Sequence, residues 1–171
     1  STSVLPAGVD ELVATYRSIS RVPRLMEVHI PGNPELESDA DLHRRATAIT
    51  EPDSGSSALA LETTAAPSGD GWVLDGSKTF VTNAPVADLF VVYARTGGPG
   101  FAGLTCFLIP KQTKGLTVGP PMEKMGLRTS PMAQVFLEDC RVPASAVVGS
   151  VGSGAMIFHQ TMDTERLVVM A

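Results

Sequence analysis

Phe80 and Thr82 have the residue types and the spacing to hold a flat ligand. Residues 77–82 alternate in character with a period of two, which predicts a strand whose one face carries Lys78, Phe80 and Thr82. An aromatic ring beside a hydroxyl can pack against a planar ligand and hydrogen-bond its polar edge. The alternative is an ordinary half-buried strand with Phe80 in the core, because strands commonly contain aromatic residues and threonine.

The predicted strand at 77–82 needs a turn before it. Asp75-Gly76 is a typical turn sequence of a two-residue hairpin, because both central positions require backbone angles that Asp and Gly tolerate. We therefore expect residues 71–74 and 77–82 to form the two arms of a hairpin.

Two polar loops contain further groups that could bind a ligand. Residues 50–57 read Thr-Glu-Pro-Asp-Ser-Gly-Ser-Ser; such small residues allow close backbone approach, and exposed amides could hold an anionic group. Residues 124–131 contribute two cations and hydroxyl side chains. A plain connecting loop and a solvated turn are the corresponding alternatives.

The composition is that of an ordinary globular protein. The chain has 171 residues, of which 43% are hydrophobic and 18% charged, so it can bury a core and form one modest domain or slightly more. Its net charge of −5 argues against a nucleic-acid partner, since a phosphate-binding surface normally carries a basic excess.

Metal binding and membrane insertion find no support in the sequence. The two cysteines, Cys106 and Cys140, have no metal-ligand spacing, and neither do His29, His43 and His159. A reduced intracellular protein is the simplest interpretation. No stretch is long enough for a membrane span, and no signal-peptide pattern opens the chain.

The pattern of elements changes near residue 46. Residues 9–19 have apolar positions at helical spacing, and 21–30 could form a second short helix. Runs rich in Val, Ile, Thr and Phe then alternate with turn residues, which predicts strands at 46–50, 58–65, 71–74, 77–82, 89–95, 103–109, 116–118, 133–137 and 147–148. A helix begins near Met156. The expected fold class is mainly β, an antiparallel β-barrel or sandwich with short flanking helices.

Six motifs in order make the sequence resemble the acyl-CoA dehydrogenase family over roughly residues 30–171. Each motif alone is moderately specific, but their order and spacing together are highly specific. They lie at residues 50–57, 75–83, 88–92, 124–128, 138–143 and 165–166. The resemblance implies a remnant of a helical domain over 1–45, a β-barrel middle domain over 46–153 and the start of a C-terminal four-helix bundle over 154–171.

The resemblance also implies a flavoprotein oxidoreductase. Members of the family bind FAD between the β-domain and the bundle and dehydrogenate an acyl thioester: a carboxylate removes the α-proton, and the β-hydrogen passes to the flavin as hydride. Electrons then leave to an electron-transferring flavoprotein. We accordingly expect a role in fatty acid metabolism, an acyl-CoA or acyl-carrier thioester as substrate, a homo-oligomer when full length, and a bacterial cytoplasmic location rather than the mitochondrial matrix.

The family's binding roles fall on particular residues of this sequence. The resemblance implies flavin contacts at Ala48, Ile49, Thr50, Ser56, Phe80, Val81 and Thr82. The Phe80 ring would lie against the isoalloxazine, with the Thr82 hydroxyl near its hydride-accepting nitrogen and the Thr50 hydroxyl at its pyrimidine end. Substrate contacts would involve Ser56, Ser130, Asp163 and Arg166. The two-residue period of residues 77–82 places Phe80 and Thr82 on one face of the predicted strand, and the resemblance assigns the same face to the flavin.

The sequence departs from the family pattern in two residues and in extent. Ser57 replaces a usual Asp, and Thr47 occupies a position often taken by an aromatic residue. The family's catalytic carboxylate belongs to the bundle, so we assign neither Glu51 nor Glu165 as the base and expect this chain alone to be inactive. We interpret the chain as part of a longer dehydrogenase. The alternatives are a non-catalytic acyl-thioester or carrier-binding domain, and part of a flavin monooxygenase of the same fold.

Overall fold

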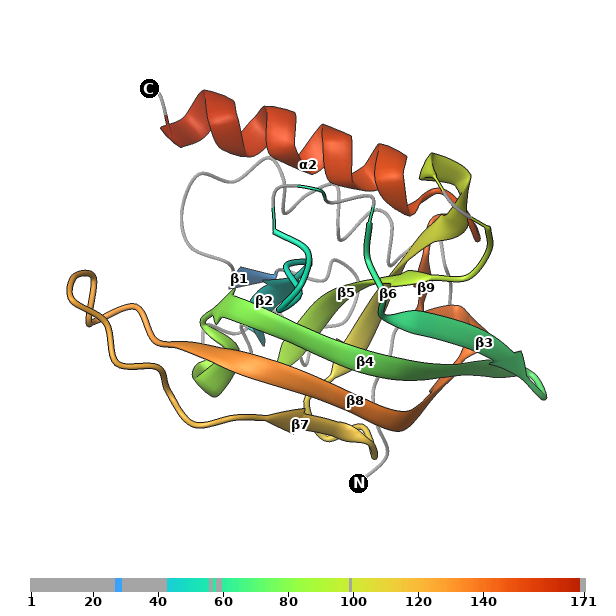
Figure 1. Cartoon of the computed structure of the whole chain (residues 1–171), viewed down its shortest axis with the longest axis horizontal. Coiled ribbons are helices and arrows are strands. Elements are labelled where there is room, and N and C mark those ends of the chain that lie inside the picture. The colour runs from blue at the N-terminus through green and yellow to red at the C-terminus, as the bar shows by residue number, and fades with distance from the viewer. Residues whose placement is uncertain (1–26, 29–42, 56, 58–59, 99, 170–171) are drawn as a thin grey trace.

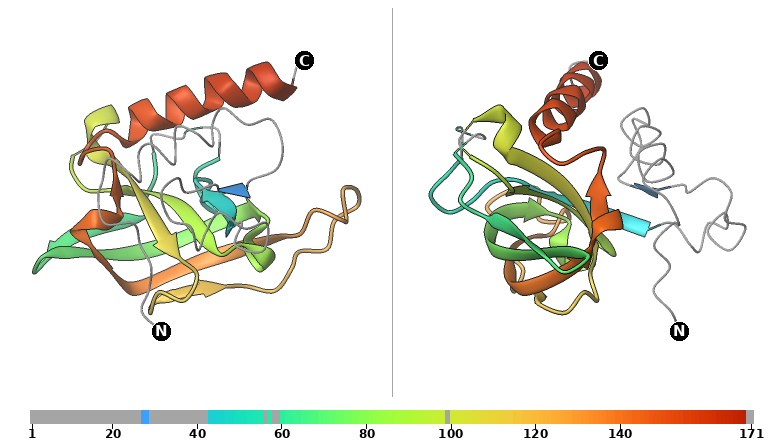
Figure 2. Two further views of the ribbon diagram at one scale, coloured as in Figure 1. Left: turned by 180° about the vertical axis from the view of Figure 1, so that it is seen from behind. Right: turned by 90° about the vertical axis from the view of Figure 1, so that its right-hand side faces the viewer.

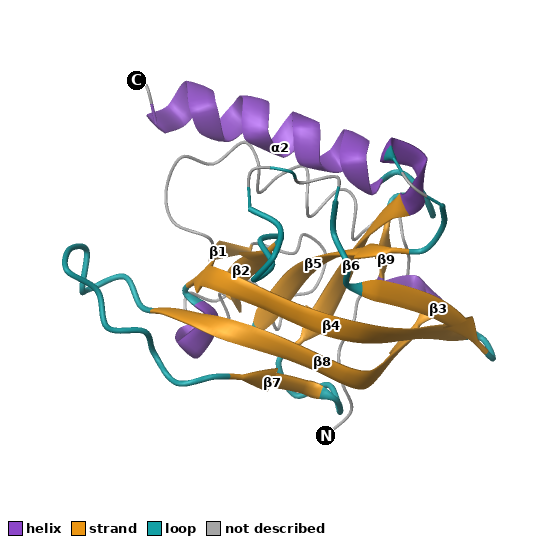
Figure 3. Cartoon of the chain, in the orientation of Figure 1, coloured by secondary structure: helices purple, strands orange, loops and turns teal. Residues whose placement is uncertain are grey.

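The described part of the chain is built mainly from strands. The computed structural model describes residues 27–28, 43–55, 57, 60–98 and 100–169. Its strands are β1 (Glu27–Val28), β2 (His43–Ala48), β3 (Thr64–Ser68), β4 (Gly71–Thr82), β5 (Leu89–Arg95), β6 (Leu104–Pro110), β7 (Leu116–Val118), β8 (Met132–Pro143) and β9 (Val147–Val148). The helical elements are η3 (Ala84–Val86), η4 (Phe101–Gly103), η5 (Ala144–Ala146) and α2 (Gly154–Val169). Figure 3 shows the predominance of strands, with α2 running across one side.

The strands form one open, mixed sheet. The neighbour order is β1-β2-β5-β3-β4-β8-β7, with β6 paired to β5 and β9. β2 and β3 run parallel to β5 because they reach it through crossovers rather than hairpins, whereas the other pairs are antiparallel. Two further views show how strongly the sheet curls (Figure 2). Among the described strands, the two ends of the pairing order, β1 and β7, do not pair with each other, so the sheet stays open. The predicted mainly β class is confirmed, and the sheet differs from a closed antiparallel barrel in being open and mixed.

The central strands β5 and β6 are buried on both faces. Phe90 and Val92 of β5 point into the main core with residues of β4 and β8, whereas Val91 and Tyr93 point into a second apolar cluster that includes α2. The side chains of β6 alternate between the same two clusters. This burial explains why both strands are nearly continuous apolar runs in the sequence.

The turn between β3 and β4 lies at Gly69-Asp70, where Gly69 takes a φ of +60°. The prediction of a turn at Asp75-Gly76 is therefore wrong. Both residues lie inside β4, where the pairing with β8 shifts register and Gly76 has a φ of +146°. Asp-Gly marks a β-bulge here, because a bulge also needs a residue that tolerates positive φ. The two strands predicted on either side of it are one long strand.

Helix α2 covers the outer face of β5 and β6 (Figure 1). Ala155 and Ile157 are buried in the cluster that these strands form. Phe158 meets Tyr93 edge to face, with ring centroids 5.9 Å apart. The helix predicted near Met156 is thus confirmed, and it begins at Gly154.

The N-terminal predictions fall mostly outside the described residues. The helix predicted at 9–19 lies wholly outside them. Of the helix predicted at 21–30, the structure describes only Glu27–Val28, and there the prediction is wrong because these residues form β1 and pair with β2. Among the helices that the structure describes, none is long and apolar enough to cross a membrane.

Candidate functional site

A second bulge in β4 turns Phe80 outward. The pairing of β4 with β8 shifts register between Lys78 and Val81, and Phe80 takes a left-handed φ of +54°. Its side chain is 62% exposed, whereas Lys78 is fully buried. The prediction that Lys78 and Phe80 share a face is therefore wrong, because the bulge breaks the two-residue period between them. An aromatic residue is unusual at such a backbone angle, and here its ring remains accessible to a ligand.

The end of β2 lies next to this bulge. β2 pairs with β5 as far as Ala48, and beyond it the Thr79 amide donates a hydrogen bond to the Thr50 carbonyl oxygen at 2.7 Å. This bond places Thr50 beside the residue that precedes Phe80. The side chains of Thr50 and Thr82 are half-buried, and neither hydroxyl has a hydrogen-bond partner among the described residues. Both hydroxyls are therefore available to a ligand.

The start of β8 brings Ser130 to the same end of β4. Thr82 pairs with Met132, and the Asn83 amide donates to the Pro131 carbonyl oxygen at 2.7 Å. The half-buried Ser130 belongs to the long loop between β7 and β8, which reaches beyond the sheet in Figure 1. The predicted substrate serine thus lies at the end of β4 that carries the predicted flavin residues.

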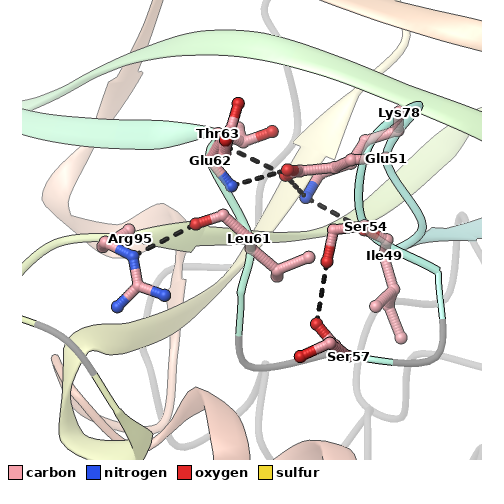
Figure 4. Close-up of polar contacts among 9 residues, drawn as sticks. All are labelled: Ile49, Glu51, Ser54, Ser57, Leu61, Glu62, Thr63, Lys78 and Arg95. Carbon is pink, nitrogen blue, oxygen red and sulfur yellow. Dashed lines mark hydrogen bonds and ion pairs between the residues drawn. The ribbon is translucent and has the colours of Figure 1, made fainter.

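Lys78, two residues before Phe80, forms a buried ion pair with Glu51 (Figure 4). The distance between Lys78 Nζ and Glu51 Oε1 is 2.7 Å, and the two side chains are 0% and 5% exposed. Lys78 Nζ also donates to the Ile49 carbonyl oxygen at 3.2 Å. Burial lowers the pKa of Lys78 from 10.5 to about 8, although the ion pair with Glu51 opposes this shift.

The Glu51 carboxylate also binds two backbone amides. Its Oε2 accepts the Glu62 amide at 2.6 Å, and its Oε1 accepts the Thr63 amide at 3.0 Å. Burial alone would raise the pKa of Glu51, but the hydrogen bonds from Lys78, Thr63 and Glu62 hold it below the usual value of 4.5. A carboxylate with a lowered pKa and occupied oxygens is a poor general base.

The other predicted site residues differ in what they present to a ligand. Ala48 and Val81 are buried in the core and are 0% and 2% exposed, so neither presents a surface to a ligand in this structure. Ile49 is half-buried and packs against the cluster under α2. The structure describes no side-chain position for the remaining ones, Ser56 in the loop and Asp163 and Arg166 on α2.

The sequence reasoning missed the structural role of Lys78 and Glu51. A lysine in an alternating strand is normally expected on the solvent side, so no local signal predicts that Lys78 is buried. A more distant signal exists, because the motif at 50–57 contains Glu51 and the motif at 75–83, which carries the predicted ligand face, contains Lys78. Two opposite charges in adjacent motifs could have indicated a pair.

The sequence of the β-sheet region matches a known family. The family model for the acyl-CoA dehydrogenase middle domain matches residues 46–140. This chain belongs to the acyl-CoA dehydrogenase family. A second family model, for bacterial archaeo-eukaryotic release factor family 7, matches residues 1–52. Most of these residues lie outside the part of the chain that the structure describes.

Relatives of this chain include enzymes named for carrier-protein and for CoA substrates. The L-prolyl-(peptidyl-carrier protein) dehydrogenase of Serratia sp. is 43% identical over 122 residues, which are 71% of this chain and 32% of that protein. The human mitochondrial short-chain specific acyl-CoA dehydrogenase is 43% identical over 121 residues, which are 70% of this chain and 29% of that protein. The chain spans about a third of the length of the curated relatives it matches.

A solved relative contains the cofactor that the resemblance implies. The FAD complex of PigA superimposes on this chain with a TM-score of 0.72 at 40% sequence identity. The match covers 77% of this chain and 34% of that one.

Proposed function

We propose that this chain supplies the β-domain side of the flavin and substrate site in an FAD-dependent acyl-thioester dehydrogenase. The observation that carries the proposal is the outward ring of Phe80, held at a left-handed backbone angle beside the end of β2. Holding an aromatic residue in this conformation costs free energy, and such strain is typical of sites that bind a ligand.

The residues present fit a flavin. An exposed aromatic ring can pack against a flat tricyclic ring, and the hydroxyls of Thr50 and Thr82, which have no partner in the described part of the chain, can donate to its polar edge. Ala48 and Val81 are 0% and 2% exposed, so they support these residues from within the core and offer no accessible surface of their own. The combination of one exposed ring and these two hydroxyls suits a planar group with a polar rim.

When bound, FAD supplies the two-electron acceptor for the hydride that leaves the β-carbon of the substrate. The chain's own residues orient that reaction: Phe80 fixes the plane of the ring, and Thr50 and Thr82 fix its position within that plane. Glu51 cannot take the α-proton, because its carboxylate is buried and bonded to Lys78. We propose that a carboxylate outside the described side chains removes it.

We propose a thioester of the acyl-pantetheine type as the substrate, carried by CoA or by a carrier protein. Its contacts would come from Ser56, Ser130, Asp163 and Arg166, and its electrons would pass to an electron-transferring flavoprotein. We also propose the division into 1–45, 46–153 and 154–171 as helical, β and bundle segments, a homo-oligomer, and a cytoplasmic role in fatty acid metabolism.

The test is anaerobic reduction of the flavin in the full-length protein loaded with FAD. We expect butyryl-CoA or a butyryl-carrier protein to bleach the absorbance of the oxidised flavin and to yield the α,β-unsaturated thioester. Whichever of the two thioesters reacts shows whether CoA or a carrier protein carries the substrate. A flavin that stays oxidised with both thioesters would contradict the proposal. Thioester-independent oxygen consumption would then indicate a monooxygenase, and absence of flavin binding would indicate a non-catalytic domain.

A further inference from the structure

We propose that Lys78, through its ion pair with Glu51, is a positioning residue that fixes the end of β2 relative to Phe80. The inference rests on the proposed function, because the end of β2 and Phe80 are taken as two sides of a flavin site. The ion pair is proposed to set the spacing between them. Neither residue is proposed to touch the flavin or the substrate. Three backbone segments meet at this pair (Figure 4): β4, which carries Lys78, the segment after β2, which carries Glu51, and the segment before β3. The last two give it backbone hydrogen bonds, through the Ile49 carbonyl and through the amides of residues 62 and 63.

Consecutive residues of β4 hold consecutive carbonyl groups of the segment after β2. Lys78 Nζ donates to the Ile49 carbonyl oxygen at 3.2 Å, and the Thr79 amide donates to the Thr50 carbonyl oxygen at 2.7 Å. The next residue along β4 is Phe80. These two bonds therefore hold the backbone of Thr50 next to that of Phe80, since β2 no longer pairs with β5 beyond Ala48.

The carboxylate end of the pair anchors the root of the loop at 50–57 and the segment before β3. Glu51 Oε1 and Oε2 accept the Thr63 and Glu62 amides, at 3.0 and 2.6 Å. The backbone of Glu51 also closes a tight turn with Ser54 through two hydrogen bonds, of 3.0 and 3.2 Å. Loss of Lys78 would leave this carboxylate buried without its cation, so the loop root and the segment before β3 would have to move.

Stability alone does not account for placing an ion pair here. Burying two charges costs hydration free energy, and apolar residues of similar volume often replace a buried pair without loss of stability. Apolar side chains cannot, however, hold a carbonyl group and two amides at fixed spacing. A ligand site must be held to within about 0.5 Å, so such bonds matter most at the end of β4 where the ligand would bind.

The chain offers a matched control in the pair Arg141–Asp139. Its Nη2–Oδ1 distance is also 2.7 Å, but the side chains are 64% and 67% exposed. Arg141 pairs with Val73 near the opposite end of β4 from Phe80. Substitution of Arg141 therefore removes an ion pair of the same length without touching the candidate site.

The experiment compares Lys78→Met, Glu51→Gln, the double variant and Arg141→Met in the full-length protein. Three quantities are measured: the thermal unfolding midpoint, the FAD dissociation constant by titration of the apoprotein, and hydrogen exchange at the amides of Glu62, Thr63 and Thr79. We expect Lys78→Met to lower the midpoint and weaken FAD binding about tenfold or more, and Arg141→Met to change neither.

The double variant separates positioning from stability. It removes the uncompensated charge, so we expect the midpoint to recover while FAD binding stays weak and the three amides exchange faster than in the wild type. Recovery of FAD binding together with the midpoint would overturn the proposal. If Lys78→Met does not fold, the unfolding midpoint and FAD binding are compared between Glu51→Gln and the double variant instead.

The two proposals can fail separately. If the wild-type protein binds no FAD, the proposed function fails, and amide exchange in the apoprotein still decides the positioning role: faster exchange at Glu62, Thr63 and Thr79 in the double variant supports it, and unchanged exchange overturns it. If the wild type binds FAD and all variants bind it equally, only the positioning role fails.

Discussion

The amide of Thr79 donates a hydrogen bond to the carbonyl oxygen of Thr50 at 2.7 Å and thereby joins the end of β2 to the bulge in β4. The two strands are far apart in the sheet order, because β5 and β3 stand between them. Their ends meet here, next to the position where Phe80 faces outward. The candidate site is thus assembled from two irregular segments, each stabilised by the other.

Replacement of Thr50 or Thr82 by valine should weaken FAD binding and leave stability nearly unchanged. Valine keeps the shape of threonine but cannot hydrogen-bond, and each lost bond costs about 0.5–1.5 kcal/mol, or roughly two- to tenfold in affinity. Fluorescence titration with FAD measures the effect. Thr117→Val, on the exposed side of β7, is the control. Unaltered affinity in both site variants would exclude these hydroxyls as flavin ligands.

Replacement of Gly76 by alanine should destabilise the protein by more than about 1 kcal/mol. Gly76 has a φ of +146°, and a Cβ there would lie 2.6 Å from Thr63 Oγ1 and 2.8 Å from Thr63 Cα. Gly126→Ala is the control, since a Cβ at that position would meet nothing within 4 Å. Urea unfolding measures both variants. Equal stability of the two would contradict the account of the bulge.

The sequence predicts those features of the fold that depend on neighbouring residues, and it does not predict those that depend on partners distant in the chain. The apolar runs of β5 and β6 identify buried strands because both faces are covered. Asp75-Gly76 misleads, because a hairpin turn and a bulge require the same residue types, and only the pairing with β8 distinguishes them. The burial of Lys78 depends on Glu51, which is distant in sequence, so no rule about strand periodicity can predict it. Phe80 is predicted as a ligand residue, but the bulge that exposes it is not.

The lowered pKa of Lys78 predicts a change of stability with pH. Its pKa is about 8 in the folded protein and 10.5 ordinarily. Between these values the unfolded chain binds a proton that the folded chain lacks, so the unfolding free energy rises with pH, by at most about 1.4 kcal/mol per pH unit. Lys78→Met lacks this titration. Urea unfolding from pH 7 to 11 measures the unfolding free energy of both proteins. The value for the wild type minus that for the variant should rise with pH. A difference that stays constant or falls would refute the assignment.

The buried thiols should resist alkylation in the folded protein. Burial raises the pKa of Cys106 to about 12 and that of Cys140 to about 11, so almost no thiolate exists at pH 8. Iodoacetamide should therefore modify neither residue in buffer and both in about 8 M urea, which exceeds the unfolding midpoint of most domains. Peptide mass spectrometry detects the modification. Rapid native labelling of either would show that its surroundings open.

The measurement that tests the central claim most directly is titration of the full-length apoprotein with FAD, comparing the wild type with Phe80→Ala and Leu127→Ala. Leu127 is the matched control, because it is also apolar, 82% exposed and left-handed, with a φ of +48°, but it lies in the loop between β7 and β8. If the flavin rests on Phe80, the wild type and Leu127→Ala bind FAD alike, and Phe80→Ala binds it about tenfold more weakly. Equal binding by all three proteins would contradict the claim.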